Sequence, residues 1–365
     1  MLSQEGSHET HPVGRSHTGT DIPGYPDLQQ KKRRWGMKRL MTIFTATVML
    51  ATMSSCSRIP LYDPISSIYL RIDLKLNSNV TLDQDIDIEG NAELKEKVYG
   101  KIPETVRACF YSTEHHNLVA EEFLPAEGGF VDIPAGTYDI IVYSLGTEST
   151  RTKDTESRSG ANAFTSETGA TVRIAYGTDD TKAIEDYRVF HEPDHLFTGV
   201  RNNVEVPVHA EHEETVIIDV EMTTLLDTYS LEVRYVEGAG RIRKADVYIT
   251  GQTPSKYMWD RRYPNKSGAI YFQSEINESK GNLYTVFNTF GKFPGAHNDV
   301  YLNVLVTDIQ GGRHQWVYDV TDQFDDPDNH THQIIIDDPI KIPDDEGGFT
   351  HDVTDWKDEV IYVPL

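Results

Sequence analysis

Alternation of aliphatic and polar residues is the most regular pattern in this chain. Across residues 68–76 every second residue is Ile or Leu, and Tyr69, Arg71, Asp73 and Lys75 stand between them. A repeat of two is typical of a β-strand with one buried face. We therefore predict a strand over residues 68–76.

Shorter stretches of the same kind recur along the chain, separated by turn residues. Two of them lie within residues 128–143, where Pro134 and Gly136 predict a hairpin or a β-arch. A stripe of apolar residues with helical spacing extends no further than about two turns, and residues 92–98 are the one short helix candidate. Many short strands with turn residues between them indicate paired antiparallel sheets, so we predict an all-β fold. The other predicted strands are 106–112, 118–124, 170–176, 188–190, 204–209, 214–222, 229–236, 244–250, 269–275, 283–289, 299–308, 313–319, 333–336 and 360–364.

The strand pattern is interrupted in three places. Residues 77–104 are polar and predict a long loop, and residues 146–169 are rich in Ser, Thr, Glu and Arg and predict an exposed loop with little to bury. A third pause at residues 223–228 predicts a domain boundary. We expect an N-terminal β-sandwich over residues 67–226 and a C-terminal β-sandwich over residues 227–365.

A different pattern precedes the strands. Lys38 and Arg39 are followed by an uncharged, mostly apolar run over residues 40–53. This run is shorter than the roughly 20 apolar residues that a membrane-spanning helix needs, so it predicts a cleaved secretion signal. We predict a signal peptide over residues 37–55 and interpret residues 1–36 as a non-native extension upstream of the true start.

Cys56 stands at the predicted cleavage point, after two serines. A cysteine there is typical of bacterial lipoproteins, in which the thiol is acylated and the acyl chains hold the protein to a membrane. The alternative is a chance cysteine after an ordinary signal peptide. We predict lipidation at Cys56 and a short tether over residues 56–66.

Net charge limits the partners. The whole chain carries a formal charge of −24, and residues 56–365 retain 27 basic against 54 acidic residues after the seven basic and four acidic residues of 1–55 are removed. Such a chain does not suit nucleic acid, and it does not adhere to anionic lipid through its own surface. Membrane attachment would therefore depend on the acyl chains at Cys56.

Residues with catalytic or metal-binding chemistry are few. Cys109 lies within a strand pattern and is predicted to be a buried structural cysteine. His330 and His332, downstream of three aspartates, could share one face of a strand as metal ligands, but an ordinary acidic turn explains them better. No phosphate loop, nucleophile elbow, zinc helix or dinucleotide fingerprint is present. We predict a protein that is not an enzyme and has no cofactor and no metal.

An aromatic patch is the remaining candidate site. Tyr257, Trp259, Arg261 and Tyr263 lie close together in the sequence, and flat rings and guanidinium planes suit contacts with sugars or proteins. Packing in a core or a turn explains the same residues equally well. The patch is thus a candidate ligand site.

Residues 192–199, with the sequence Glu-Pro-Asp-His-Leu-Phe-Thr-Gly, resemble the fimbrillin-like superfamily of Bacteroidales surface lipoproteins, in particular its Mfa-type, fimbrial subunit-like branch. The signal ending at Cys56, the turn in residues 133–143, and Gly347, Gly348 and Trp356 agree with this resemblance. It implies two tandem transthyretin-like antiparallel β-sandwich domains and a role in fimbriae.

The resemblance also implies association by strand exchange, in which a strand from one subunit completes the sheet of another. In such subunits an arginine-specific protease removes the first strand, but Arg71 and Arg107, the nearby arginines, both lie within predicted strands. We therefore expect a lipid-anchored fimbrial anchor, accessory or adhesin-like subunit at the outer membrane, with other fimbrial subunits, host molecules or glycans as partners. The acidic export signal that often follows the cysteine is missing, so the sequence does not assign the protein to the inner or the outer leaflet of the outer membrane. The alternative is a surface lipoprotein that binds glycans or peptides and has no role in fimbrial assembly.

Overall fold

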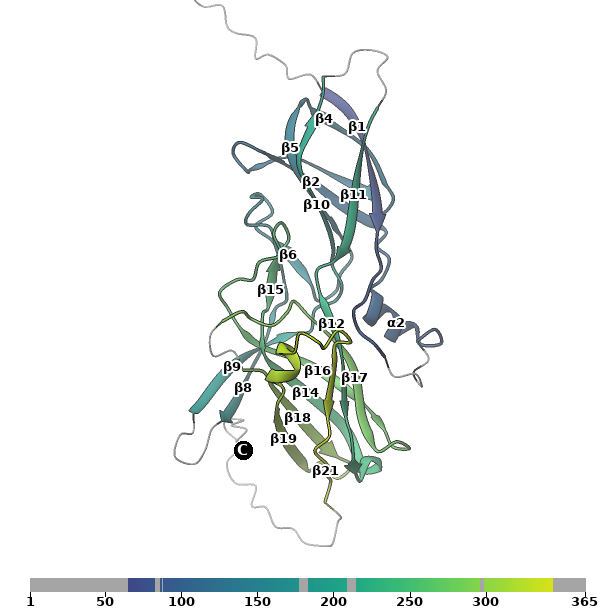
Figure 1. Cartoon of the computed structure of the whole chain (residues 1–365), viewed down its shortest axis with the longest axis vertical. Helices are drawn as coiled ribbons and strands as arrows, with labels where there is room; N and C mark the ends of the chain where they lie inside the picture. The colour runs from purple at the N-terminus through teal and green to yellow at the C-terminus, as the bar shows by residue number, and fades with distance from the viewer. Residues whose placement is uncertain are drawn as a thin grey trace, which may run out of the picture. The chain divides into compact units, whose positions relative to one another are not determined.

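The computed structural model of the chain describes residues 65–82, 86, 88–176, 183–208, 215–295 and 299–343, and the regular secondary structure of these residues is almost entirely β (Figure 1). Helices α2 (Ala92–Tyr99) and α3 (Thr321–Asp325) and the 3₁₀ turn Ala239–Arg241 are short. The predicted all-β fold and the predicted short helix at 92–98 are confirmed, whereas α3 was not predicted. Among the described residues, no helix combines the length and apolar character needed to cross a membrane.

Seven strands form the first sheet, in the order β3-β2-β5-β10-β11-β1-β4. Their inward side chains meet in one core, which includes Ile68 and Leu70 of β1 and Phe110 of β2. Burial alternates along β1 and β11 because one face packs on this core and the other does not, whereas β2 and β5 are buried on both faces. The strands are β1 (Ile65–Leu74), β2 (Thr105–Ser112), β3 (Leu118–Pro125), β4 (Gly128–Pro134), β5 (Gly136–Ser144), β10 (Phe197–Val206) and β11 (Val216–Thr224).

Strand β1 lies inside this sheet, with a hydrogen-bonded neighbour on each side. It pairs parallel with β11 from Ile68↔Val216 to Leu74↔Met222, and antiparallel with β4 from Ile65↔Pro134 to Arg71↔Gly128. The strongest strand prediction is thereby confirmed, three residues earlier at its start and two at its end. Strand β4 pairs with β1 and not with β5, so the turn at residues 134–136 is an arch between layers.

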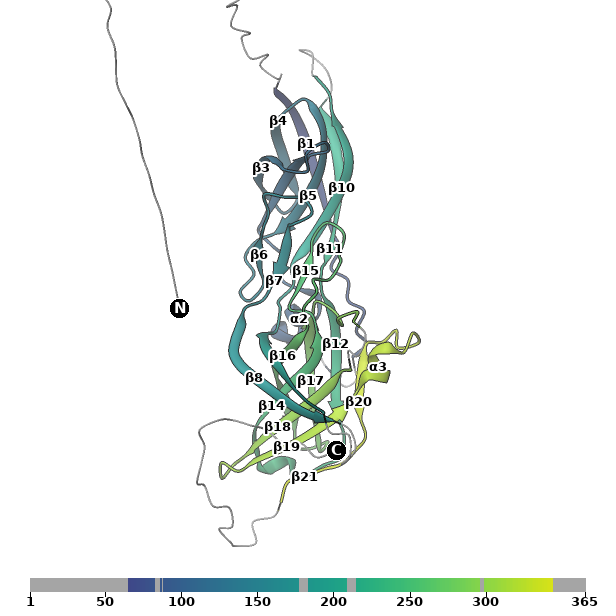
Figure 2. The same ribbon diagram turned by 90° about the vertical axis from the view of Figure 1, so that its left-hand side faces the viewer.

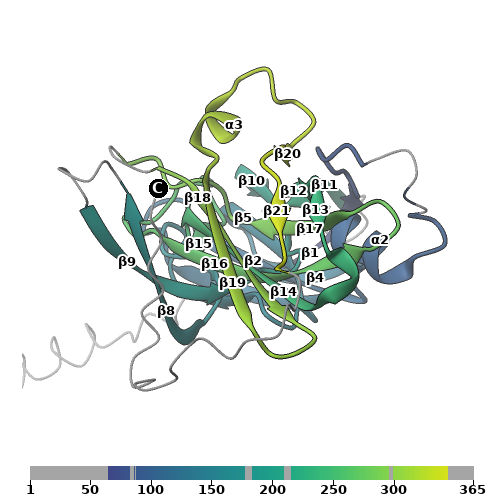
Figure 3. The same ribbon diagram turned by 90° about the horizontal axis from the view of Figure 1, so that it is seen from below.

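Nine strands form the second sheet, with the path β19-β18-β14-β16-β17-β12-β20, and β9 joins it beside β16 and pairs with β8 (Figure 3). Its main core runs through β12, β14, β16, β17 and β18. The strands are β8 (Glu167–Tyr176), β9 (Ala183–His191), β12 (Asp227–Val233), β14 (Ile242–Gln252), β16 (Gly268–Asn277), β17 (Asn282–Thr289), β18 (Tyr301–Asp308), β19 (Arg313–Asp319) and β20 (Gln333–Ile336). A further pair is β13 (Val236–Glu237) with β21 (Ile340–Lys341).

The chain steps from the first sheet to the second between Thr224, the last residue of β11, and Asp227, the first of β12. The proposed division at residues 226 and 227 falls in this step. Strands β8 and β9 precede it in the sequence but pair within the second sheet. The strands of the two sheets are therefore not separated by a single point in the sequence.

The prediction of an exposed loop over residues 146–169 was wrong. This stretch contains β6 (Arg151–Lys153) and β7 (Asn162–Phe164), which form a three-stranded sheet with β15 (Ser255–Tyr257) in the order β15-β7-β6 (Figure 2). Ala161 and Ala163 are fully buried and cover the outer face of β2 and β5, against Ile141 and Tyr143. Small residues do this covering, so the stretch carries no aliphatic pattern that would predict it.

Adjacent Ile217 and Ile218 break the alternation of aliphatic and polar residues in the sequence, but the strand itself is regular. Burial alternates regularly along β11, with Ile218, Val220 and Met222 inside and Ile217 55% exposed on the outer face. Ile217 is an exposed aliphatic residue next to Tyr69 of β1, and not a sign of a bulge. Strands β18 and β19 form a hairpin, and residues 309–312, which include Gly311 and Gly312, connect them.

Candidate functional site

Cys56, the predicted lipidation site, lies outside the described residues, as do the signal peptide and the predicted strand at residues 360–364. Eight residues, 57–64, separate Cys56 from the first residue of β1. Lipidation at Cys56 stays a prediction.

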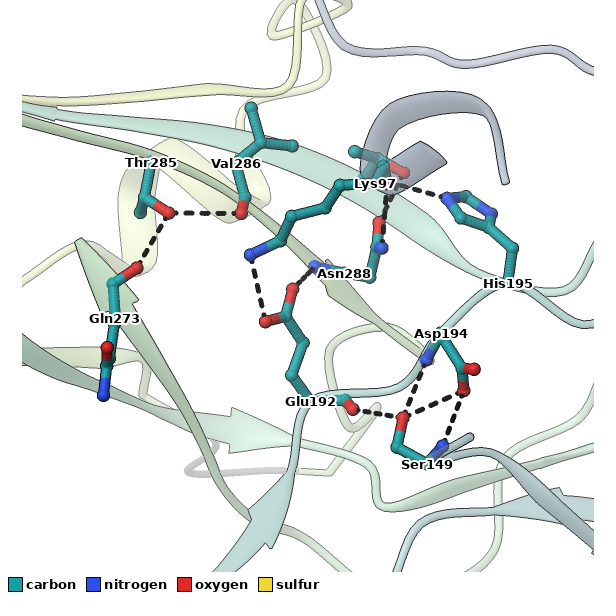
Figure 4. Close-up of polar contacts among 10 residues, drawn as sticks. Lys97, Ser149, Glu192, Asp194, His195, Gln273, Thr285, Val286 and Asn288 are labelled. Atoms are coloured by element: carbon teal, nitrogen blue, oxygen red, sulfur yellow. Dashed lines mark hydrogen bonds and ion pairs between the residues drawn. The ribbon is translucent and has the colours of Figure 1, made fainter. Parts of the chain in front are cut away.

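Residues 192–199 lie where the first sheet, α2 and β17 meet (Figure 4). Asp194 holds the loop after β5, because its carboxylate accepts hydrogen bonds from the backbone N–H groups of Glu148, Ser149 and Thr150 at 2.5, 3.1 and 2.6 Å. The Ser149 hydroxyl also donates to this carboxylate at 2.9 Å. These hydrogen bonds favour the charged form and hold the pKa of Asp194 below its usual range, against the opposing effect of burial.

Glu192 joins the segment after β9 to α2 and β17. Its carboxylate lies 3.1 Å from the Lys97 ammonium and accepts a hydrogen bond from the backbone N–H of Asn288 at 2.8 Å. Its side chain is only 19% exposed, and this burial raises the pKa of Glu192 although Lys97 opposes the shift. The pair therefore links three segments that are distant in the sequence.

His195 is buried and uses both ring nitrogens. Nε2 lies 2.9 Å from the Lys97 carbonyl oxygen and Nδ1 lies 2.8 Å from the Thr224 hydroxyl. A carbonyl oxygen only accepts, so Nε2 carries the proton and Nδ1 accepts from Thr224. Burial lowers the pKa of His195, and the ring is neutral at pH 7. Asn288 also donates to the Lys97 carbonyl, at 3.0 Å.

These contacts make the motif a structural junction. Every acidic or basic group in it is engaged by a partner within the chain, and none is arranged as a nucleophile with a base. The sequence motif pointed to Glu192, Asp194 and His195, but it did not identify Lys97 or Asn288. Nothing in the sequence near those two residues marks them, because their role depends on contacts across 95 residues or more.

Open depressions flank α2 on two sides. One of about 830 Å³ is lined by residues that include Lys101, Glu104, Glu148 and Asp194, and one of about 750 Å³ lies against the β16–β17 hairpin. Their walls are mostly polar and charged, which differs from the largely apolar lining of typical small-molecule sites.

The four residues of the predicted aromatic patch lie in or just after β15. Cations of the same chain lie over the rings of its three aromatic residues. The Arg262 guanidinium lies 3.6 Å from the Tyr257 ring centroid, and Arg158 lies 4.3 Å from that of Trp259. Trp259 also packs against the core behind β2 and β5. Each of these two rings thus has a face occupied by a guanidinium, which leaves less ring surface for a sugar.

Tyr263 and Arg261 also contact groups of the same chain. The Lys256 ammonium lies 5.1 Å from the Tyr263 ring centroid, and burial raises the pKa of Tyr263. Arg261 is exposed and donates to the Thr224 carbonyl at 3.1 Å. Whether the patch binds a ligand stays a prediction.

The histidine and cysteine candidates lie in separate environments. His332 stacks on Tyr229 with 4.5 Å between ring centroids, and its Nδ1 lies 3.2 Å from the Thr228 carbonyl oxygen. Over the part of the chain that the structure describes, no three His, Cys, Asp or Glu side chains are grouped to hold a metal ion. Cys109 is fully buried, and burial raises the pKa of its thiol to about 11.

A family model described as "Domain of unknown function (DUF5119)" matches residues 95–273. A candidate fimbrium anchoring subunit, Fim4B from Bacteroides ovatus, is 24% identical over 233 residues, which are 63% of this chain and 60% of that protein. The crystal structure of a candidate adhesin from Bacteroides ovatus superposes with a TM-score of 0.54 at 19% identity, over 80% of this chain and 99% of that chain.

The chain is thus similar to fimbrial proteins of Bacteroidales in sequence and in fold. The resemblance that the sequence suggested is confirmed. The fimbrial anchor protein Mfa2 from Porphyromonas gingivalis is also similar, with a TM-score of 0.44 and 10% identity over 74% of this chain and 90% of that chain. The chain spans about 60% of the length of Fim4B.

Proposed function

We propose that this fimbrillin-like chain is a lipid-anchored anchor or accessory subunit of a fimbrium, held at the outer membrane by acyl chains on Cys56 and associating with other subunits through strand complementation. The observation that carries this proposal is the position of β1. Eight residues separate it from Cys56, and it is paired with β11 and β4 over seven residue pairs each.

An interior strand is a strong attachment point. Ile68 and Leu70 of β1 are 0% exposed and pack in the core of the first sheet. A pull transmitted from Cys56 would act along β1, so that many hydrogen bonds and buried contacts would have to break together. This arrangement favours a subunit that retains β1 and its lipid.

Retention of β1 is also supported by the positions of Arg71 and Arg107. Arg71 lies inside β1 and pairs with Asp219 of β11 at 2.5 Å, and Arg107 lies inside β2 and contacts Glu121 and Tyr143. No arginine occurs in residues 72–106. An arginine-specific protease would therefore find no arginine in the connection after β1.

The way in which β1 is held shows the physical basis of strand complementation. If β1 were withdrawn, β4 and β11 would each lose a full set of main-chain hydrogen bonds, and the buried positions of Ile68 and Leu70 would open. A strand from another subunit could fill this groove by the same alternation. In an anchor subunit that keeps β1, the complementing strand would instead come from elsewhere in the chain, and residues 353–365 are the segment we propose.

The test combines labelling with pull-down. Radiolabelled palmitate should be incorporated into the wild-type chain and not into Cys56→Ala, and protease treatment of intact cells should show which leaflet displays the protein. Wild-type protein without label would remove the lipid anchor. If a chain lacking residues 353–365 still co-purifies with the same outer-membrane polypeptides as the full chain, donation by that segment is wrong.

A further inference from the structure

The outward face of strands β4, β1 and β11 carries a row of exposed apolar side chains. Paired residues of neighbouring strands point to the same side of a sheet, and the register aligns Phe130, Tyr69 and Ile217 across the three strands. Phe130 is 65% exposed and Ile217 is 55% exposed, whereas their neighbours Val131 and Ile218 are buried in the core. The row therefore projects away from the core.

The row continues toward the start of β1. Ile65 lies four residues before Tyr69, on the same side of the strand, and is 53% exposed. It pairs with Pro134 of β4. The Tyr69 and Phe130 rings meet edge to face, with 5.1 Å between their centroids. We call Ile65, Tyr69, Phe130, Pro134 and Ile217 the apolar patch.

The charged residues beside the apolar patch largely neutralise one another. Arg71 and Asp219 form the next aligned pair on β1 and β11 and lie 2.5 Å apart. Asp132 of β4 is exposed at the edge of the patch. The row beyond Arg71 holds Asp73, Glu221 and Lys75, which pairs with Asp73 at 2.6 Å. These six residues carry a net charge of −2, so attraction to anionic lipid would not hold this face to a membrane.

We infer that the apolar patch docks on the surface of the bilayer that holds the acyl chains of Cys56, an inference that rests on the proposed lipid attachment. Nine residue steps join Cys56 to Ile65, so the patch begins at most about 30 Å from the lipid. A tether this short keeps the bilayer surface at a high local concentration. Exposed rings and aliphatic side chains suit the headgroup level of a bilayer, where a nearby carboxylate stays hydrated.

A second copy of the chain is another occupant that an apolar face could have. The three most exposed residues of the patch present on the order of 300 Å² of apolar surface, against roughly 800 Å² per partner in a stable interface. A bilayer does not need this area, because the acyl chains supply the attachment and the patch only orients the sheet. The first sheet would thus lie on the membrane with the side formed by β4, β1 and β11.

The test uses the lipidated full chain with Ser67→Cys, labelled with the dye NBD and reconstituted in phosphatidylcholine vesicles with or without nitroxide-labelled lipid. Ser67 is exposed on β1 beside the patch, Cys56 is acylated and Cys109 is buried, so the dye reacts at residue 67. Nitroxide lipid should quench about half of the emission at residue 67, because the docked face lies in the headgroup region. Ser279→Cys, in the exposed turn between β16 and β17, is the matched control and should lose less than about a tenth.

Loss of the patch should release the face. Phe130→Ser with Ile217→Ser should reduce the quenching at residue 67 about twofold or more. Val119→Ser with Ile309→Ser removes two exposed aliphatic residues elsewhere and should leave the quenching unchanged. Equal quenching in these two double variants, or quenching at residue 279 as strong as at residue 67, would overturn the docking.

Two further outcomes separate the possible explanations. Emission at residue 67 that rises with protein density, without quenching by nitroxide lipid, would assign the patch to a second copy of the chain. The mass of the purified chain reports the acyl chains on Cys56. Acyl chains without quenching would refute the docking alone, whereas their absence would refute the lipid anchor and the docking together.

Discussion

Glu192 and Lys97 form an ion pair of 3.1 Å that joins the loop after β9 to helix α2. The main chain of Lys97 takes part as well, because its carbonyl oxygen accepts from His195 and Asn288. One residue near the end of a short helix is thus held by its side chain and by its backbone. Since α2 buries only Val98 fully, these polar contacts position the helix more than its packing does.

Lys97→Met should destabilise the folded chain, because it leaves the buried Glu192 carboxylate without its cation. We expect a loss of about 2 kcal/mol in the free energy of unfolding at pH 7, between the values for exposed pairs and for fully buried ones. Because burial already raises the pKa of Glu192, the carboxyl takes up a proton readily as the pH falls, and the loss should be smaller at pH 4.5 than at pH 7. Urea denaturation at both pH values measures it, with Lys97→Met/Glu192→Gln as the control that should recover part of the loss. An equal loss in the single and double variants would contradict this account.

Protonation of His195 should destabilise the junction. The pKa of His195 is lower in the folded chain than the ordinary value of 6.5, so the unfolded chain binds the proton first as the pH falls. The stability due to neutral His195 is therefore present above pH 6.5 and is lost below it. The melting temperature should fall between pH 7.5 and 5.5, and His195→Gln should reduce this fall. His115→Gln, at an exposed turn, is the control and should leave it unchanged; a fall that is the same in all three proteins would rule out His195 as its source.

Leu70→Ala should test the attachment that β1 provides. Leu70 is 0% exposed in the core of the first sheet, and removing a buried leucine side chain typically costs about 2–5 kcal/mol. Ile65→Ala, on the same strand but 53% exposed, should cost less than about 1 kcal/mol. Urea unfolding of the Cys56→Ser chain gives both values. Similar costs for the two substitutions would mean that β1 is not anchored in the core as described.

Cys109 should be unreactive in the folded chain. It is fully buried, and with its pKa raised to about 11 the reactive thiolate is scarce at pH 8. In the Cys56→Ser chain, Ellman's reagent should detect almost no thiol in native buffer and one thiol in 6 M guanidinium chloride. Rapid reaction in native buffer would show that β2 opens.

The strand pattern was readable because a half-buried strand imposes a repeat of two on its own residues. This local rule predicted β1, β2 and β3 within a few residues, and helical spacing predicted the short helix α2. The same rule failed at Ile217, since an exposed aliphatic residue beside Tyr69 looks like a buried one in the sequence. It failed at residues 146–169 because Ala161 and Ala163 bury against β2 and β5 without any repeat of their own.

The candidate sites divide in the same way. The order of charged and apolar residues around Cys56 predicts secretion and lipid attachment. The motif at residues 192–199 predicts a resemblance to a family. Both signals can be read because each is contiguous in the sequence. Neither the pairing of Glu192 with Lys97 nor the row of Phe130, Tyr69 and Ile217 can be read from spacing. Those relationships depend on which strands become neighbours, and long-range pairing is decided by the packing of whole sheets rather than by any local run of residues. The residue pattern was sufficient for the fold class and for the resemblance to a family, and the tertiary structure alone decided the junction.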